Sequence, residues 1–341
     1  MSPARATVER AGIDTWSPCW YVDHDSPSAR AMLALARVPG PLSSWLVPGD
    51  VAGHRVGWFP ATHLVFAEGH PAEAGQLARV TSLPGALDRL VRALDAAGLP
   101  LPPGRALRAP RRGREPRPGF AGLRRLDAAV DVRFEDPALG LAVLGLVGWL
   151  DPPRGRTSVW TDRGRVTTVY LHGYARNSVR GRIYDKGNDS GDAPRGQLIR
   201  LEDQRRWQAG RRPAVDVGPA TVHRLFRDRF GYTARAPRAI VGKLPALGER
   251  LAQLVDEGAI TPGRAERMLG FIGLEAVGHA RQGMSRRTYY RRRAEVRELG
   301  LVLAQVPGQA HDLDLAALLE PALGPGAWER IEQDAAAAAA G

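Results

Sequence analysis

Large apolar residues alternate with small or polar ones in several short stretches of the first hundred residues. Segments 13–22 (IDTWSPCWYV) and 55–69 (RVGWFPATHLVFAEG) have this period of two, which predicts half-buried strands. Segment 86–98 has helical spacing instead and ends at Gly98, before Pro100. This predicts a helix whose apolar face contains Leu87, Leu90, Val91 and Leu94.

The alternation returns after residue 120. Strands are predicted over LRRLDAAVDVRF (123–134), RGRIYD (180–185) and QLIRLEDQ (197–204), and a hairpin over 157–173 with its turn at Asp162-Arg163-Gly164. The apolar run 139–150 is shorter than the ~20 residues of a membrane span, which predicts a buried helix. The fold class expected is therefore α+β, a mostly antiparallel sheet with helices on one face.

Helical spacing dominates from residue 243 onwards, and Ser285 and Gly300 mark the start and the end of the last helix there. Five regions follow from these patterns. Residues 1–101 and 120–232 form two halves of one catalytic domain, joined by a Pro- and Arg-rich linker or loop at 102–119. Residues 243–303 form a helix-turn-helix-like DNA-binding region, and 304–341 an acidic C-terminal tail.

The balance of charge indicates an acidic partner. The chain has 48 Lys and Arg against 36 Asp and Glu, a formal net charge of +12, and only Lys186 and Lys243 are lysines. Nucleic acid is favoured over a membrane, because the basic stretches lack a strongly apolar opposite face. A single cysteine and an N-terminus without a signal-peptide core predict a cytoplasmic protein that does not bind membranes.

The segment SRRTYYRRRAEVRELG contains six arginines and follows a short turn, QGMS. Two helices, a turn and a basic helix are the layout of a helix-turn-helix, whose second helix enters the major groove. The alternative is a solvated surface helix, which most runs of charge are. The residues predicted to contact DNA are Arg286, Arg287, Thr288, Tyr290 and Arg291.

Carboxylates occur in three of the predicted strands. Asp127 and Asp131 are four residues apart, so that both point to one face, while Glu202 and Glu68 belong to two further strands. Any one of them is more often an ordinary surface residue. Together they supply the oxygen ligands that Mg²⁺ or Mn²⁺ requires.

Tyr184 and Lys186 would share a face if their strand continued through both residues. A tyrosine nucleophile needs activation, and a lysine can lower its pKa or stabilise phosphate charge. A lysine can also exchange a proton, which an arginine cannot do in practice. An ordinary strand tyrosine beside a chance lysine fits the same spacing.

Several familiar motifs are missing. The eight histidines include no His-x-His pair, the spacing of His54, His63 and His70 matches no metal motif, and no GxxxxGK[ST] sequence is present. The chain is therefore not expected to be its own helicase.

Five segments in order resemble motifs of the replication initiators of rolling-circle plasmids and filamentous phages, in the gene II-type and plasmid Rep branches without the double-histidine motif. The segments are FAEGHPAEA, RRLDAAVDV, TVYLHGYARNSVRGRIYDKGND, LIRLEDQRR and SRRTYYRRRAEVRELGL. The resemblance implies an endonuclease that nicks and rejoins origin DNA through a 5′-phosphotyrosine.

The resemblance also assigns roles to residues. Tyr184 would be the nucleophile with Lys186 assisting, and Glu68, Asp127 and Glu202 would hold one Mg²⁺ or Mn²⁺. Asp131 is a further candidate ligand, and Tyr174 and Tyr170 are alternative or additional nucleophiles.

The expected partners are origin DNA, double-stranded and as exposed single strand, with a host helicase and DNA polymerase. A second copy of the chain, as a homodimer, is a further candidate. Two other functions stay open: a non-enzymatic, site-specific DNA-binding regulator of a mobile element, and a relaxase or transposase that uses the same chemistry.

Overall fold

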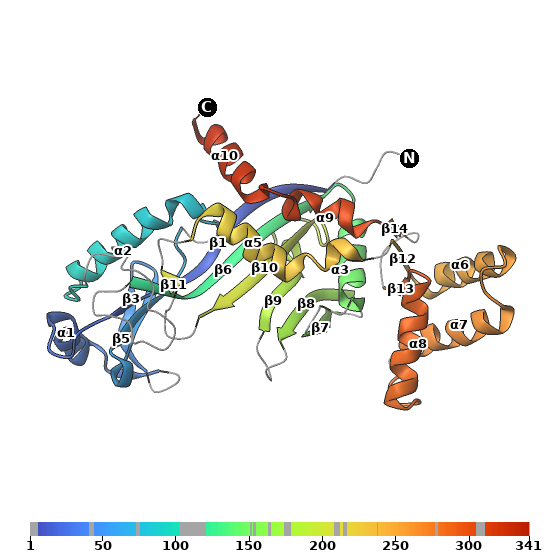
Figure 1. The fold of residues 1–341 in the computed structure, drawn as a ribbon, viewed down its shortest axis with the longest axis horizontal. Coiled ribbons are helices and arrows are strands. Elements are labelled where there is room, and N and C mark those ends of the chain that lie inside the picture. Colours follow the sequence, from blue (N-terminus) through green and yellow to red (C-terminus); the bar gives the residue numbers. More distant parts are fainter. Residues whose placement is uncertain are drawn as a thin grey trace. The chain divides into compact units, whose positions relative to one another are not determined.

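The computed structural model describes residues 6–40, 44–72, 76–101, 121–150, 152, 155–162, 165–173, 179–207, 212–213, 217–236, 238–276, 279–304 and 311–340. The chain divides into two compact units that are interleaved in sequence (Figure 1). Unit 1 comprises Met1–Glu9, Asp131–Leu201 and Asp228–Gly324, and unit 2 comprises Arg10–Val130, Glu202–Arg227 and Pro325–Gly341. The predicted linker at 102–119 lies outside the described residues.

Three long strands contribute residues to both units: β1 (Ala6–Tyr21), β6 (Ala121–Phe134) and β10 (Leu198–Arg206). The chain therefore passes between the units within strands. Helix α5 (Pro219–Phe230) also contributes to both.

Unit 2 is built on an antiparallel sheet in which β5 pairs with β4 and β1, β4 with β3, and β3 with β2. Its remaining strands are β2 (Val38–Pro39), β3 (Trp45–Val51), β4 (His54–Phe59), β5 (Leu64–Gly69) and β11 (Arg212–Pro213). Its helical elements are α1 (Pro27–Leu35), η2 (Pro60–Thr62), η3 (Val80–Ser82), α2 (Leu83–Ala96) and α10 (Ala327–Ala340). Helix α2 is the predicted amphipathic helix, and it buries Leu87, Leu90 and Leu94.

Helix α10 belongs to the core of unit 2. Trp328 is fully buried, with its ring 5.6 Å from that of Phe226. The buried carboxylate of Glu332 accepts hydrogen bonds from the backbone N–H of Val80 and Thr81 and from the Thr81 hydroxyl. The sequence predicts an acidic tail for residues 304–341. The structure shows that part of this segment, α10, is a helix packed into unit 2 through Trp328 and Glu332.

Unit 1 contains an antiparallel run of strands, β7 (Gly155–Asp162), β8 (Arg165–Gly173) and β9 (Val179–Asp185). Helix α3 (Pro137–Trp149) lies on one face of these strands (Figure 1). On its other side α3 contacts a small sheet of order β13-β12-β14, formed by β12 (Ala239–Gly242), β13 (Leu301–Leu303) and β14 (His311–Leu313). Contacts on both sides explain why this predicted buried helix is apolar all round.

The remaining helices of unit 1 are α4 (Lys186–Ser190), η6 (Thr233–Arg235), α6 (Leu244–Asp256), α7 (Pro262–Ala276), α8 (Arg286–Glu298) and α9 (Leu315–Leu323). Helices α6, α7 and α8 share a core that includes Leu251, Phe271, Tyr289 and Val296. The α+β fold class predicted from the sequence is confirmed. Within the described parts of the chain, no helix combines the length and the apolar composition that a membrane crossing needs.

Candidate functional site

Two of the predicted acids meet at one arginine in unit 2. The guanidinium of Arg125 donates from Nη1 to Glu68 Oε1 and from Nε and Nη2 to both carboxylate oxygens of Asp127, at 2.5–3.0 Å. Arg125 and Asp127 are two residues apart on β6 and therefore share a face, while Glu68 comes from β5. Strand pairing thus gathers side chains 57 residues apart in sequence.

Asp127 is nine-tenths or more buried, and burial raises its pKa to about 7. Arg125 lowers this pKa, whereas the negative charges of Glu202 and Asp14 raise it further. Burial by itself lowers the pKa of Arg125. The bonds of Arg125 to Asp127 and Glu68 outweigh this effect and raise its pKa above the ordinary value. Carboxylates from four strands (β1, β5, β6 and β10) therefore interact electrostatically around Asp127 and Arg125. We call Glu68, Arg125, Asp127 and Glu202 the acidic cluster.

The donor atoms of the acidic cluster fit Mg²⁺ or Mn²⁺ in their chemistry, since all are carboxylate oxygens. Their arrangement is that of an ion-pair cluster centred on Arg125. Across the described ranges, no three His, Cys, Asp or Glu side chains stand at a spacing that would hold an ion. A metal here would have to take the place of the guanidinium between Glu68 and Asp127.

Asp131 has a different role from Asp127. It lies in unit 1, where Arg200 Nε donates to Oδ1 at 2.5 Å and Nη2 to Oδ2 at 2.8 Å. Both side chains are buried. This two-pronged ion pair joins β6 to β10 and uses both carboxylate oxygens of Asp131.

Tyr184 lies near the end of β9 and is buried at 6% exposure. The guanidinium carbon of Arg182 lies 4.6 Å from the centroid of its ring. The predicted strand stops at Asp185, whose side chain caps α4, so Lys186 is the first residue of a helix. The shared-face argument for Tyr184 and Lys186 is therefore wrong, because the strand alternation ends before Lys186. Lys186 Nζ lies 3.8 Å from Asp189 Oδ2.

Strand register shows which residues share a face with Tyr184. Tyr184 is opposite Thr168, which is opposite Trp160; Arg182 is opposite Tyr170, which is opposite Ser158. Directly paired residues of antiparallel strands point to the same side. Tyr170 therefore lies on the face of Tyr184, and Tyr174 lies outside the described residues.

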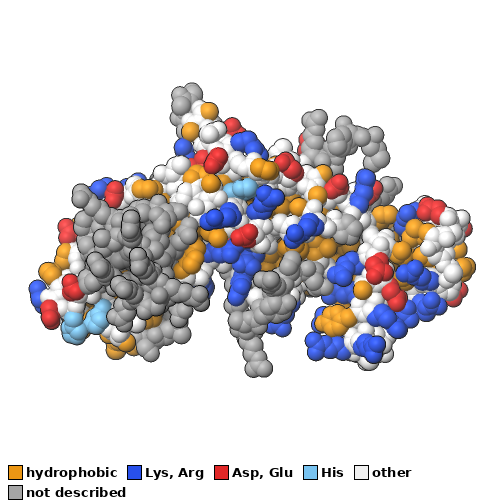
Figure 2. All heavy atoms as spheres, in the orientation of Figure 1, with side chains coloured by type: hydrophobic (Ala, Val, Ile, Leu, Met, Phe, Trp, Pro, Cys, Tyr) orange, Lys and Arg blue, Asp and Glu red, His pale blue; other side chains and the backbone are white. Residues whose placement is uncertain are grey.

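The arginine-rich helix α8 is exposed where the sequence predicts DNA contacts. Arg286, Arg287, Tyr290 and Arg291 are exposed and Thr288 is half-buried. Figure 2 shows Lys and Arg side chains gathered over α7 and α8. The connection from Ala276 to Arg286 is longer than the three or four residues of a helix-turn-helix turn.

The arginines of α8 are not equivalent. Arg293 donates to the carbonyl oxygens of Gly148 and Trp149 at 3.2–3.3 Å and lies over the Trp149 ring, so it caps α3. Arg292 pairs with Glu295. Arg281, which sequence reasoning missed, lies over Tyr289 and joins a cavity of about 260 Å³ lined also by Arg286, Tyr289 and Tyr290.

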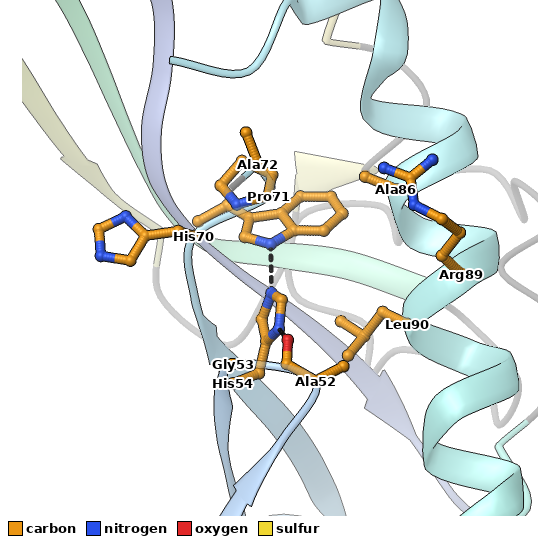
Figure 3. Close-up of a pocket in the computed structure, with 10 residues that line it drawn as sticks. Ala52, Gly53, His54, His70, Pro71, Ala72, Ala86, Arg89 and Leu90 are labelled. Atoms are coloured by element: carbon orange, nitrogen blue, oxygen red, sulfur yellow. Dashed lines mark hydrogen bonds between the residues drawn. The ribbon is translucent and has the colours of Figure 1, made fainter. Parts of the chain in front are cut away.

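A larger cavity of about 660 Å³ lies in unit 2 (Figure 3). Trp16 Nε1 donates to His54 Nε2 at 2.8 Å, so the proton of His54 is on Nδ1, which donates to Ala52 O at 2.8 Å. Burial lowers the pKa of His54. His54 thus bridges two elements of the cavity wall, and no predicted site residue lines the cavity. Its lining is Trp16, Ala52, Gly53, His54, His70, Pro71, Ala72, Ala86, Arg89 and Leu90.

Sequence reasoning also missed Arg125, Arg182 and Trp160. Arg125 is two residues before Asp127 on the same strand, and this spacing could have indicated it. Arg182 is likewise two residues before Tyr184 on its strand, whereas Trp160 emerges only from strand register, which the sequence does not reveal.

Comparison with solved structures gives a likeness of low sequence identity. The chain is similar to the structure of the rolling circle replication initiator protein from Geobacillus stearothermophilus, with a TM-score of 0.32 and 14% sequence identity over 66% of this chain and 86% of that chain. No protein-family model and no curated protein matches the chain.

Proposed function

We propose that this protein nicks and rejoins DNA as a rolling-circle replication initiator. The proposal rests on the acidic cluster. Three carboxylates from different strands, those of Glu68, Asp127 and Glu202, interact with one another or with Arg125 at a buried position. Burial is the main cause that raises the pKa of Asp127 to about 7, and the charge of Glu202 raises it further; a protein that only binds DNA has no need of a carboxylate perturbed in this way. This supports an enzyme over a regulator.

Tyr184 is the nucleophile in this proposal. Its Oη attacks the phosphorus of an origin phosphodiester, the P–O3′ bond breaks, and a 5′-phosphotyrosine and a 3′-hydroxyl form. The proton leaves Oη as the bond to phosphorus forms, and the departing O3′ takes up a proton. Attack by a 3′-hydroxyl on the phosphotyrosine reverses these steps and rejoins the strand.

Two cations near Tyr184 fit these steps. Arg182 lies over the Tyr184 ring, where its positive charge can stabilise the charge of a phosphate under attack. Lys186 follows at the start of α4, next to Asp189, and a lysine in this position can hold or pass on the proton.

In the proposed enzyme, Glu68, Asp127 and Glu202 would hold one Mg²⁺ or Mn²⁺, which would neutralise phosphate charge when bound. Arg125 then has to release Glu68 and Asp127. Tyr184 belongs to unit 1 and the acidic cluster to unit 2. Helix α8 finds the origin, and helicase and polymerase come from the host.

The test is a nicking assay on supercoiled plasmid carrying the protein's own locus. We expect Mn²⁺-dependent relaxation with protein attached to the 5′ end, and loss of both in Tyr184→Phe. A Tyr21→Phe variant, changed in unit 2, is the matched control and should keep full activity. Activity that survives in Tyr184→Phe would transfer the role to Tyr170 or Tyr174.

Tight, specific binding without a nick in any metal would overturn the proposal. The non-enzymatic regulator would then be the better assignment, with α8 as its DNA-binding element.

A further inference from the structure

The two faces of the β7–β9 strands differ in chemistry. One face presents Val169, Leu171 and Ile183, all at most 1% exposed, toward α3. A Cβ on Gly148 of α3 would lie 3.7 Å from Val169, which shows how closely the helix covers this side. The other face carries the residues in register with Tyr184, and we call it the aromatic face: Arg156, Ser158, Trp160, Tyr170, His172, Arg182 and Tyr184.

The aromatic face is exposed at its outer strand and becomes buried toward β9. Trp160, on β7, is 66% exposed, which is unusual for the largest apolar side chain. Tyr170 and Arg182 are half-buried and Tyr184 is 6% exposed. The ring of Tyr170 lies 6.3 Å from that of His172, and Arg182 covers that of Tyr184. Aromatic rings are therefore present on all three strands, from the edge strand β7 to the proposed nucleophile on β9, with a guanidinium over the last ring.

The charge of the aromatic face is positive. Arg156 and Arg182 lie on it, and none of its named positions is acidic. Between the rings, Ser158 Oγ and His172 Nε2 form a hydrogen bond of 2.6 Å across β7 and β8. Burial and the nearby charge of Arg156 lower the pKa of His172, so the positive charge comes from the arginines.

We propose that the aromatic face binds single-stranded DNA, with bases stacked on Trp160 and Tyr170 and phosphates held by Arg156 and Arg182, so that the strand leads to Tyr184. Bases that are not paired in a duplex have free faces for stacking, and arginines next to aromatic rings complement the backbone between them. The aromatic face offers rings and cations on the surface of a sheet, whereas the major groove of duplex DNA is read by an inserted helix or two-stranded ribbon. This inference rests on the proposed function only for the end of the path at Tyr184; the binding itself does not depend on it.

The test measures the affinity of the full chain for a fluorescein-labelled oligo(dT) of about 16 nucleotides in EDTA, by anisotropy. We expect Trp160→Ala and Tyr170→Ala each to weaken binding about tenfold. Trp160→Phe, which keeps a stacking ring, should retain most of the affinity. Binding to a duplex of the same length should change little in all three variants.

Two matched controls separate stacking from a general surface effect. Trp45→Ala removes another half-exposed tryptophan, 43% exposed on β3 in unit 2, and Val159→Ala truncates the neighbour of Trp160 that points to the opposite face. Both should bind oligo(dT) as the unchanged protein does. Thermal melts check folding, and because Trp160 is mostly exposed its replacement should leave the melting temperature unchanged.

Unchanged affinity in both Trp160→Ala and Tyr170→Ala would overturn the inference. An equal loss of duplex and single-strand binding would overturn it as well. A change of oligomeric state without a change in affinity would also overturn it, and would assign the aromatic face to contact with a second copy of the chain. Stacking-dependent binding without nicking would leave the inference standing and remove the proposed function. Nicking by the unchanged protein, together with normal oligo(dT) binding by both variants, would overturn the inference and leave the proposed function standing.

Discussion

Arg200 holds Asp131 with two parallel hydrogen bonds, and both side chains are shielded from solvent, at 4% and 1% exposure. Arg125 binds both carboxylate oxygens of Asp127 in the same way. The partner of Asp131 comes from the next strand of the same unit, so the pair fixes β6 against β10. Asp131, a candidate metal ligand from its spacing with Asp127, thus also belongs to the framework of unit 1.

We predict that Asp131→Ala lowers the free energy of unfolding by about 3–5 kcal/mol, because the buried charge of Arg200 loses this carboxylate. Urea denaturation in EDTA measures the change. The matched control is Asp189→Ala, which removes the exposed carboxylate next to Lys186 and should cost at most about 1 kcal/mol. Normal stability combined with lost Mn²⁺-dependent nicking would return Asp131 to the list of metal ligands.

The raised pKa of Asp127 predicts a pH effect on stability. In the folded protein the pKa is about 7, against an ordinary value of 3.8, so the folded state keeps a proton that the unfolded state has lost. Stability therefore falls as the pH rises from about 4 to about 7. Relative to Asp127→Asn, the unchanged protein should lose on the order of 3–4 kcal/mol across this window.

Urea denaturation in EDTA at several pH values tests this prediction, with Asp88→Asn on the exposed side of α2 as control. The groups that face Asp127 are Arg125 on its own strand, Glu68, Glu202 and Asp14. The prediction fails if Asp127→Asn and Asp88→Asn show the same pH dependence as the unchanged protein.

The periodicity of apolar residues and the residues that end helices predicted several elements correctly. Helix α2, the buried helix α3 and the strands that flank Asp162 followed from local spacing, which neighbouring residues determine. The interleaving of two units did not, because it depends on pairings between strands more than a hundred residues apart. The packed C-terminal helix was missed for the same reason: Glu332 binds the backbone near Thr81.

The candidate site was predictable in its residue types but not in its contacts. Spacing and motif order selected Glu68, Asp127 and Tyr184. A spacing of two residues can suggest that Arg125 lies beside Asp127 and Arg182 beside Tyr184, but no local pattern indicates that Arg125 also bonds to Glu68 of another strand. Such contacts need strand register, and a shift of one residue would turn these side chains to the other face.

Two helical glycines predict opposite effects of the same substitution. A Cβ at Gly145 of α3 would lie 2.6 Å from the Cβ of Ala304, whereas one at Gly270 of α7 would meet nothing within 4 Å. Gly145→Ala should therefore destabilise the protein by about 1–3 kcal/mol through overpacking. Gly270→Ala should stabilise it by up to about 1 kcal/mol, because alanine favours a helix. Thermal melts of the two variants give the signs, and a stabilising Gly145→Ala would contradict the packing of α3 against the small sheet.

Substitutions of different arginines in α8 should affect DNA binding and stability separately. Arg286 and Arg287 are exposed and, within the described part of the chain, form no ion pair, whereas Arg293 caps α3 through Gly148 and Trp149. In the double variant Arg286→Gln and Arg287→Gln, we expect weaker binding to origin duplex with unchanged stability. If both contact phosphates, the slope of log K against log salt should shrink by about 2.

Arg293→Gln is the matched variant from the same helix. It should lower the free energy of unfolding by about 1–2 kcal/mol, because the last carbonyl groups of α3 lose a charged donor and Trp149 loses its cation. Below its melting temperature, its DNA affinity and salt slope should match those of the unchanged protein. Equal losses of affinity in Arg293→Gln and in the double variant would mean that α8 does not present Arg286 and Arg287 to DNA, and that binding depends only on the integrity of unit 1.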